Sequence, residues 1–239
     1  ISNVLPIGGL FAERFMYFPS IAYCFLFAYV FLKIFAYFRQ NKNATGRLAT
    51  FLALIVVIGF YAQAAAARNY VWRNDVILWL DTSQKTPQSY RPLEYLGDAY
   101  AYYGEGYFEK AVAAYHEALK RPGAPEVKIR NSLGTVYAAM NKHDLALDEF
   151  KRALSLNNRS VVGYYNVGIT YFFKGEYEKA LAYFKAGQAI DKNYFWAYYG
   201  IGLVYEKQGR FNESREMFRQ ALNLSPDFKM AQTALERLP

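Results

Sequence analysis

The sequence has a single cysteine and only two histidines, His116 and His143. One cysteine cannot form an internal disulfide or a cysteine-rich zinc site, and two histidines argue against a metal centre built from several imidazoles. We find no phosphate-binding glycine loop and no set of residues typical of a catalytic centre. We therefore expect no cofactor and no metal, and we assign no catalytic residue in this chain.

The charge is unevenly distributed along the chain, although its net value is +8. Residues 1–86 contain eight Lys and Arg against three Asp and Glu, whereas residues 87–239 contain twenty against seventeen. The excess cations thus lie in the apolar part, where they fit the flanks of membrane spans better than a nucleic-acid surface. The sequence predicts no nucleic-acid partner.

Two apolar runs in the first part contain almost no charge. Residues 18–38 are interrupted only by Lys33, and residues 48–67 contain no charged residue. Each run has about 20 residues, which is the helix length that a bilayer core of ~30 Å requires. We predict that both are transmembrane helices. The alternative is a pair of buried helices in a soluble core, although such helices are seldom free of charge over this length.

The segment between the two runs, residues 39–47, contains Arg39, Lys42 and Arg47. Cytoplasmic loops of membrane proteins carry an excess of Lys and Arg. This pattern favours a cytoplasmic position for residues 39–47. Residues 1–17 and everything after residue 68 would then lie on the other side, in the periplasm or in a lumen.

The second part of the sequence repeats with a period of 34 residues. Gly134, Gly168 and Gly202 are each followed by a tyrosine after three residues and a phenylalanine after sixteen. A less regular copy around Gly97 precedes them. This spacing resembles the tetratricopeptide repeat, in which small residues lie where paired helices touch and aromatic residues interlock.

The sequence therefore predicts an all-α fold in which two transmembrane helices are followed by a tetratricopeptide-repeat α-solenoid with about four helix-turn-helix repeats and a capping helix. The expected segments are a juxtamembrane segment (1–17), a transmembrane helix (18–38), a basic loop (39–47), a transmembrane helix (48–67), a connecting helix (68–86), four repeats (87–124, 125–160, 161–194 and 195–227) and a capping helix (228–239).

The first helix of each repeat, folded on a 3.6-residue period, has a stripe of residues that points away from its partner helix. In repeats one and two the stripe is polar and contains Arg91, Glu94, Lys128, Asn131 and Thr135. In repeats three and four it is aromatic or aliphatic and contains Tyr165, Ile169, Phe172, Trp196, Tyr199 and Leu203. We interpret it as a groove for an extended or helical polypeptide, while some of the aromatic residues can instead pack between neighbouring repeats. The candidate groove residues are Arg91, Lys128, Asn131, Tyr165, Phe172, Trp196 and Tyr199.

Some tetratricopeptide domains hold chaperone C-termini with a clamp of Lys and Asn residues. The position of the recurring Asn is occupied here by Thr135, Ile169 and Leu203. This replacement argues against a soluble, cytoplasmic co-chaperone, as do the two apolar runs.

Residues 12–20 read AERFMYFPS and are followed by an apolar run, a basic loop, a second apolar run and the repeats. This order resembles the end of the transmembrane and tetratricopeptide-repeat O-mannosyltransferases, which are GT-C membrane enzymes that use a lipid-phosphate-linked sugar. The resemblance implies that this chain is the non-catalytic, C-terminal portion of such an enzyme. It also implies that Glu13 and Arg14 lie near a polyprenyl-phosphate head group, because Arg binds phosphate through two parallel hydrogen bonds. A simple interfacial anchor is the alternative for this pair.

Two functions remain open at this level. In the first, the repeats of a membrane glycosyltransferase bind an acceptor or partner protein on the non-cytoplasmic side. In the second, the chain is a membrane-anchored scaffold for protein–protein interaction or complex assembly, without enzymatic activity.

Overall fold

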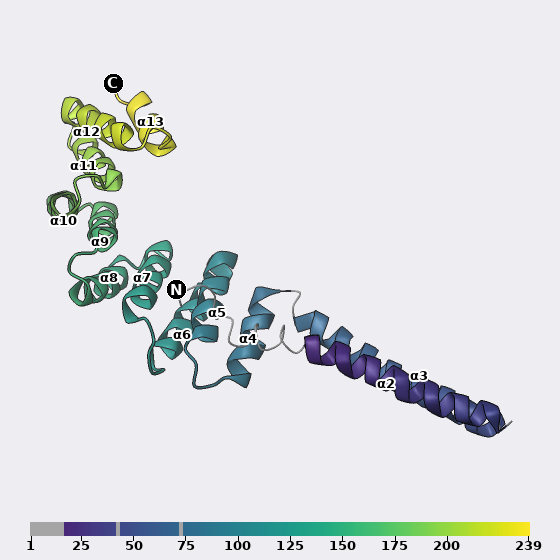
Figure 1. Cartoon of the computed structure of the whole chain (residues 1–239). Coiled ribbons are helices and arrows are strands. Elements are labelled where there is room, and N and C mark those ends of the chain that lie inside the picture. Colours follow the sequence, from purple (N-terminus) through teal and green to yellow (C-terminus); the bar gives the residue numbers. More distant parts are fainter. Residues whose placement is uncertain (1–16, 42–43, 72–73) are drawn as a thin grey trace. The chain divides into compact units, whose positions relative to one another are not determined.

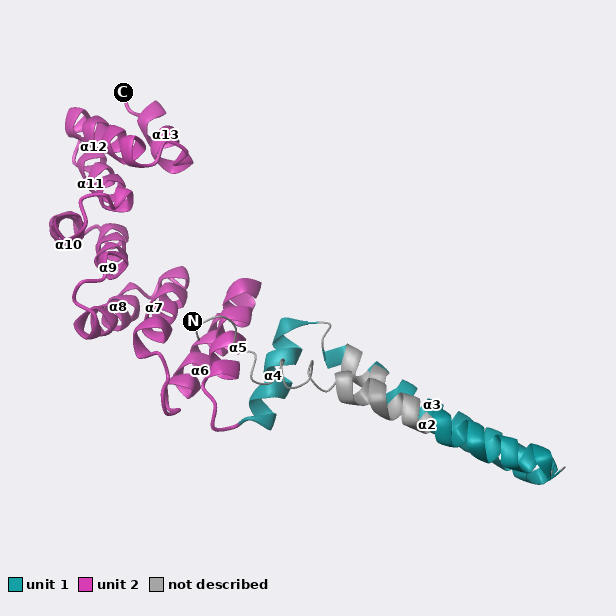
Figure 2. Ribbon diagram, viewed as in Figure 1, with its two compact units in different colours: residues 1–86 teal, residues 87–239 magenta. Residues whose placement is uncertain are grey.

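The computed structural model describes residues 17–41, 44–71 and 74–239, and in these ranges the chain is helical with no strand. The chain divides into two compact units, residues 1–86 and residues 87–239 (Figure 2). Each unit is described below on its own.

The first unit contains helices α2 (Tyr17–Gln40), α3 (Ala44–Val71) and α4 (Asp75–Lys85). Helices α2 and α3 lie side by side (Figure 1). The ring of Phe38 packs where Gly46 has no side chain, so the two helices approach closely at this end. Helix α4 begins after Asn74, whose side-chain oxygen accepts a hydrogen bond from the amide of Val76 at 2.8 Å.

One segment of the described residues, Ala44–Ala64 in α3, is long and apolar enough to cross a membrane by length and composition. It overlaps the second predicted span. Helix α2 covers the first predicted span, residues 18–38, but does not meet the same criterion within the described residues. Two spanning helices therefore stay a prediction, and the structure offers one candidate.

The second unit consists of helical hairpins that follow one another in chain order. Each hairpin packs on the next, and the last helix packs on the fourth hairpin, which makes this unit an α-solenoid (Figure 1). The hairpins are α5 (Arg91–Tyr103) with α6 (Phe108–Leu119), α7 (Glu126–Ala139) with α8 (His143–Leu156), α9 (Val161–Phe173) with α10 (Tyr177–Ile190), and α11 (Phe195–Lys207) with α12 (Phe211–Leu224). A short 3-10 helix, η1 (Glu105–Tyr107), lies in the turn of the first hairpin. The last helix is α13 (Lys229–Glu236).

The repeated glycines and aromatic residues hold each hairpin together. A Cβ atom added at Gly134 would lie 2.5 Å from the ring of Phe150, which is buried on the partner helix. The same relation joins the other three pairs, with distances of 2.5 to 2.7 Å. These pairs are Gly97 with Tyr115, Gly168 with Phe184, and Gly202 with Phe218. The predicted contact between a small residue and an interlocking aromatic ring is confirmed in every hairpin.

The turns inside the second, third and fourth hairpins also repeat every 34 residues. Asn141, Gly175 and Gly209 have positive φ angles of 58°, 78° and 73°. The amide of the next residue donates to a carbonyl five residues earlier at 2.9 Å, as in Lys142 to Tyr137. This arrangement ends a helix with a left-handed residue, a conformation that Gly and Asn tolerate best.

Candidate polypeptide-binding groove

The first helices of the hairpins (α5, α7, α9 and α11) form one face of the second unit, which we call the A-helix face. Helix α5 contacts α7, and α9 contacts α11. Side chains that point away from the partner helices therefore meet across neighbouring repeats. This is the face on which the sequence places its candidate residues.

A groove of about 660 Å³ lies in the first two repeats, and we call it the α5–α7 groove. Its volume falls within the range of pockets that hold ligands in other proteins. Three residues of the predicted stripe, Lys128, Asn131 and Thr135, line it, whereas Arg91 does not. The full lining is Ala101, Tyr115, Pro125, Glu126, Val127, Lys128, Asn131, Ser132, Thr135 and Val136.

The cation of this groove is paired within the protein. The Nζ of Lys128 lies 2.5 Å from the Oε1 of Glu94, which belongs to the neighbouring helix α5. Glu94 is only 4% exposed, whereas the side chain of Lys128 is 57% exposed. The close contact with the Glu94 carboxylate raises the pKa of Lys128 above its ordinary value. The predicted stripe contains both Glu94 and Lys128. The helical period shows which face of its own helix each residue occupies, but it does not show that residues of two different helices form a pair.

A second acidic residue of α5 lies near the same groove. The hydroxyl of Tyr115 donates a hydrogen bond to the Oδ1 of Asp98 at 2.6 Å. Burial raises the pKa of Tyr115, and the hydrogen bond to Asp98 raises it further. Glu94 and Asp98 are four residues apart on one helix, so α5 brings two carboxylates to this end of the A-helix face.

The groove also contains a polar atom with no partner among the described residues. The side-chain oxygen of Asn131 is buried and accepts no hydrogen bond. The neighbouring Thr135 is exposed, and its hydroxyl donates to the backbone carbonyl of Asn131 at 2.9 Å. A buried acceptor is costly to leave unsatisfied, so either water or a donor from a bound molecule is expected to reach it.

The aromatic part of the A-helix face is more tightly packed than the sequence predicts. The rings of Tyr165 and Trp196 lie 5.3 Å apart, and Phe228 lies 4.7 Å from Trp196 and 5.1 Å from Tyr199. Tyr199 is only 6% exposed. Tyr199 therefore follows the alternative given above for these aromatic residues, because it packs between neighbouring elements and does not lie open on the face.

The physical reason is that Phe228, which immediately precedes the last helix, covers α11 in the way that a further repeat would. Leu203, from the same predicted stripe, is buried in the same cluster. Tyr165, Phe172 and Trp196 are partly buried. Burial raises the pKa of Tyr165, and that of the adjacent Tyr194 to about 12. The α5–α7 groove is thus the more open part of the A-helix face.

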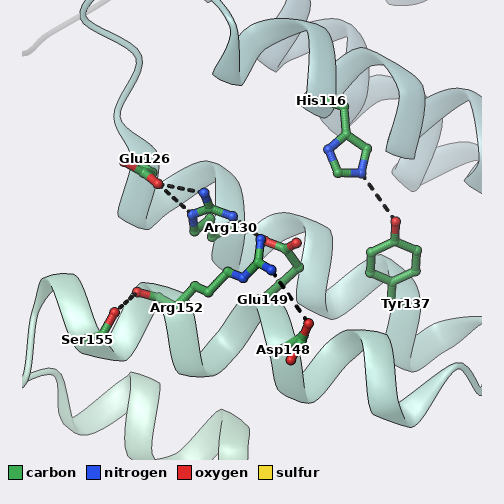
Figure 3. A network of polar contacts seen from close by, with 8 residues as sticks. All are labelled: His116, Glu126, Arg130, Tyr137, Asp148, Glu149, Arg152 and Ser155. Atoms are coloured by element: carbon green, nitrogen blue, oxygen red, sulfur yellow. Dashed lines mark hydrogen bonds and ion pairs between the residues drawn. The ribbon is translucent and has the colours of Figure 1, made fainter.

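A network of polar contacts joins α7 to α8 (Figure 3). Arg130 pairs with Glu126 at 2.6 Å and with the buried Glu149 at 2.7 Å. His116 is exposed and makes a 3.3 Å contact with the hydroxyl of Tyr137. Sequence periodicity does not reveal this network, because its residues come from different helices and follow no motif.

The remaining candidates do not form a further centre in the described part of the chain. His143 stacks on Phe173 with ring centroids 6.4 Å apart, which is a packing role. No group of three metal-ligating side chains occurs among the described residues. Glu13 and Arg14 lie outside the described residues.

The fold and the groove define a helical-repeat protein. The family model of the tetratricopeptide repeat matches residues 96–161, and a second model of the same repeat matches residues 162–227. The chain belongs to the tetratricopeptide-repeat proteins, whose repeats suggest protein–protein interaction.

Curated relatives include two O-mannosyl-transferases. The chain is 26% identical over 115 residues to Protein O-mannosyl-transferase Tmtc3 of Drosophila melanogaster, which covers 48% of this chain and 12% of the relative. It is 25% identical over 158 residues to Protein O-mannosyl-transferase TMTC3 of Mus musculus, which covers 66% of this chain and 16% of the relative. The chain thus spans less than a fifth of the length of these relatives.

Two solved structures illustrate the similarity of the fold. The crystal structure of MamA has a TM-score of 0.55 at 24% identity and covers 66% of this chain and 89% of its own. The crystal structure of YrrB, described as a tetratricopeptide-repeat protein with an unusual peptide-binding site, has a TM-score of 0.56 at 22% identity and covers 74% of this chain and 89% of its own. At these identities the likeness establishes the fold alone.

Proposed function

We propose that this chain is the repeat-bearing, non-catalytic portion of a membrane glycosyltransferase that uses a lipid-phosphate-linked sugar. Its repeats bind the acceptor or a partner protein through the A-helix face. Support comes from the named activity of the relatives, O-mannosyl transfer, and from the candidate membrane segment Ala44–Ala64 in the same chain. The observation that carries the binding role is the α5–α7 groove with its unsatisfied acceptor on Asn131.

The groove has the properties that an extended polypeptide requires. Its apolar wall, formed by residues such as Ala101, Val127 and Val136, accepts side chains, and the Asn131 oxygen accepts a backbone N–H. Tyr165, Phe172 and Trp196 extend the surface along the A-helix face as partly exposed aromatic contacts. Arg91 is exposed at the other end, where it sets the approach rate and salt dependence of a charged partner.

Photo-crosslinking in the full-length membrane protein tests this proposal. A photoreactive residue at the exposed Thr135 of the groove is compared with one at the exposed Lys185 of α10, the second helix of the third hairpin. We expect one discrete polypeptide adduct from position 135 and none from position 185. Equal labelling from both positions, or none from position 135, would count against binding in the groove.

The lipid-linked sugar is tested at Arg14, which we propose binds its phosphate. Lysine retains the charge but cannot form two parallel hydrogen bonds to one phosphate. Sugar transfer by the full-length enzyme in membranes should therefore fall with Arg14→Lys as well as with Arg14→Ala. If Arg14→Lys transfers sugar as well as the parent protein, Arg14 and Glu13 are an interfacial anchor only.

A membrane-anchored scaffold without enzymatic activity is the second candidate. It is favoured by the family models, which match the repeats alone, and tetratricopeptide repeats serve proteins of many functions. Crosslinking at Thr135 together with a complete absence of sugar transfer by the full-length protein would favour it.

A further inference from the structure

One feature of the groove is still unexplained: its one lining lysine, Lys128, already forms an ion pair within the protein. Lys128 lies on the A-helix face, where a lysine is suited to hold a carboxylate of a bound chain. Its ammonium group instead lies 2.5 Å from Glu94, a carboxylate of the same protein that is 4% exposed. A buried charge that has lost its partner is strongly unfavourable, so Glu94 holds the lysine firmly.

The other charges near the groove strengthen this effect. Asp98 lies one helical turn after Glu94 and accepts the hydroxyl of Tyr115, and no ion pair is found for it among the described residues. Glu126, a further lining residue, is paired with Arg130. Arg91 is exposed and bonds to the hydroxyl of Tyr90 at 3.4 Å, but it is not part of the lining. The groove lining therefore offers a bound carboxylate no unpaired cation, and the half-buried Asp98 nearby disfavours a further negative charge.

The neutral polar group of the lining points to a different ligand. The Asn131 oxygen is buried without a hydrogen-bond donor among the described residues, and Ala101, Val127 and Val136 line the same groove. A backbone N–H of an extended chain satisfies such an acceptor without adding charge. A chain terminus, in contrast, would bring a carboxylate into a site where Lys128 is not free.

We propose that Glu94, as the ion-pair partner of Lys128, keeps this lysine from binding a ligand carboxylate. The α5–α7 groove consequently selects an extended segment from within a polypeptide and rejects a C-terminal carboxylate. This inference rests on the proposed binding of polypeptide in the groove. Beyond that proposal, it specifies which kind of polypeptide segment binds and which residue determines this preference. Glu94 is here a specificity-determining residue that acts through Lys128.

The test uses the full chain in detergent and synthetic 12-residue peptides from a random array. Sequences that bind are remade as pairs, one with a free C-terminal carboxylate and one with a C-terminal amide, and their dissociation constants are measured by fluorescence anisotropy. For the unchanged protein we expect the free acid to bind no more tightly than the amide. In Glu94→Gln, which frees Lys128 with little change of shape, the free acid should gain about tenfold over the amide, or about 1.4 kcal/mol.

The double variant of Glu94→Gln with Lys128→Gln is the control, because Lys128→Gln alone would leave the buried Glu94 carboxylate without its partner. In the double variant the tenfold gain of the free acid should be abolished. The inference is overturned if the unchanged protein binds free acids tenfold more tightly than amides. It is also overturned if Glu94→Gln remains folded and the ratio does not change. In both cases peptide binding, and thus the proposed function, would stand; failure of every peptide to bind would overturn the proposed function as well.

Discussion

The contact between Gly134 and Phe150 offers the most quantitative test of the fold. A methyl group at position 134 would lie 2.5 Å from the ring, whereas ordinary carbon contacts are about 3.5 to 4.0 Å long. The ring must move by about 1 Å in a closely packed core, and overpacking of this kind typically costs ~1–3 kcal/mol. Alanine is better than glycine in a helix by ~1 kcal/mol. The difference predicts that Gly134→Ala destabilises this hairpin by about 1 kcal/mol.

Gly106 is the matched control for this substitution. It lies in η1, has no heavy atom within 4 Å of an added Cβ, and does not have a positive φ. Gly106→Ala should therefore be neutral or stabilising by up to ~1 kcal/mol. The assay is urea unfolding of the full chain, followed by pulsed hydrogen exchange of peptides from α5 to α8. If Gly134→Ala is as stable as Gly106→Ala, the ring of Phe150 is not fixed against Gly134 and the packing argument fails. A gain of stability when Phe150→Leu is added to Gly134→Ala would support it.

Three further predictions concern the ion network, the pH dependence and the topology. Glu149→Ala leaves Arg130 with one ion-pair partner in place of two and should lower the free energy of unfolding in urea by about 2 kcal/mol. Most of this loss should be recovered in the double variant with Arg130→Leu. A loss below ~0.5 kcal/mol would contradict the prediction. The raised pKa of Tyr115 means that its contribution to stability is complete below pH 10 and is lost as the pH rises further, so the alkaline fall in stability should be shallower in Tyr115→Phe than in the parent protein. In a chain that lacks its native cysteine and is expressed in bacteria, where the non-cytoplasmic side is the periplasm, Lys207→Cys should react with a maleimide that does not cross the inner membrane. Reaction only after the inner membrane is permeabilised would reverse this orientation.

Much of the solenoid could be predicted from sequence because its determinants are local and periodic. The spacing of Gly134, Gly168 and Gly202 requires only that each glycine meets the aromatic residue sixteen positions later, and the structure has this contact in every hairpin. The left-handed turn residues share the same period, but Asn141 replaces glycine in one of them and hides the pattern. A search for Gly or Asn at a 34-residue period would have found these turns.

The site was harder to predict because it depends on contacts between repeats. Two residues of the stripe predicted from the helical period, Lys128 and Asn131, line the α5–α7 groove. The period could not show that Glu94 binds Lys128, because the two residues are 34 positions apart and meet only when α5 packs beside α7. It also could not show that Tyr199 is buried, since Phe228 covers this residue from the following segment. Periodicity identifies which face a residue occupies, and tertiary packing decides whether that face remains open.

The most direct test of the central claim is the affinity of one array-selected peptide amide for three forms of the full chain: unchanged, Thr135→Arg and Arg219→Glu. Thr135 is exposed in the α5–α7 groove, where an arginine would fill the space. Arg219 is exposed on α12, the second helix of the fourth hairpin, and serves as the control position. Binding in the groove predicts at least a tenfold weaker dissociation constant for Thr135→Arg, with unchanged unfolding, and a value within twofold of the parent for Arg219→Glu. Equal affinity of the unchanged and Thr135→Arg proteins would contradict the claim that polypeptide binds in this groove.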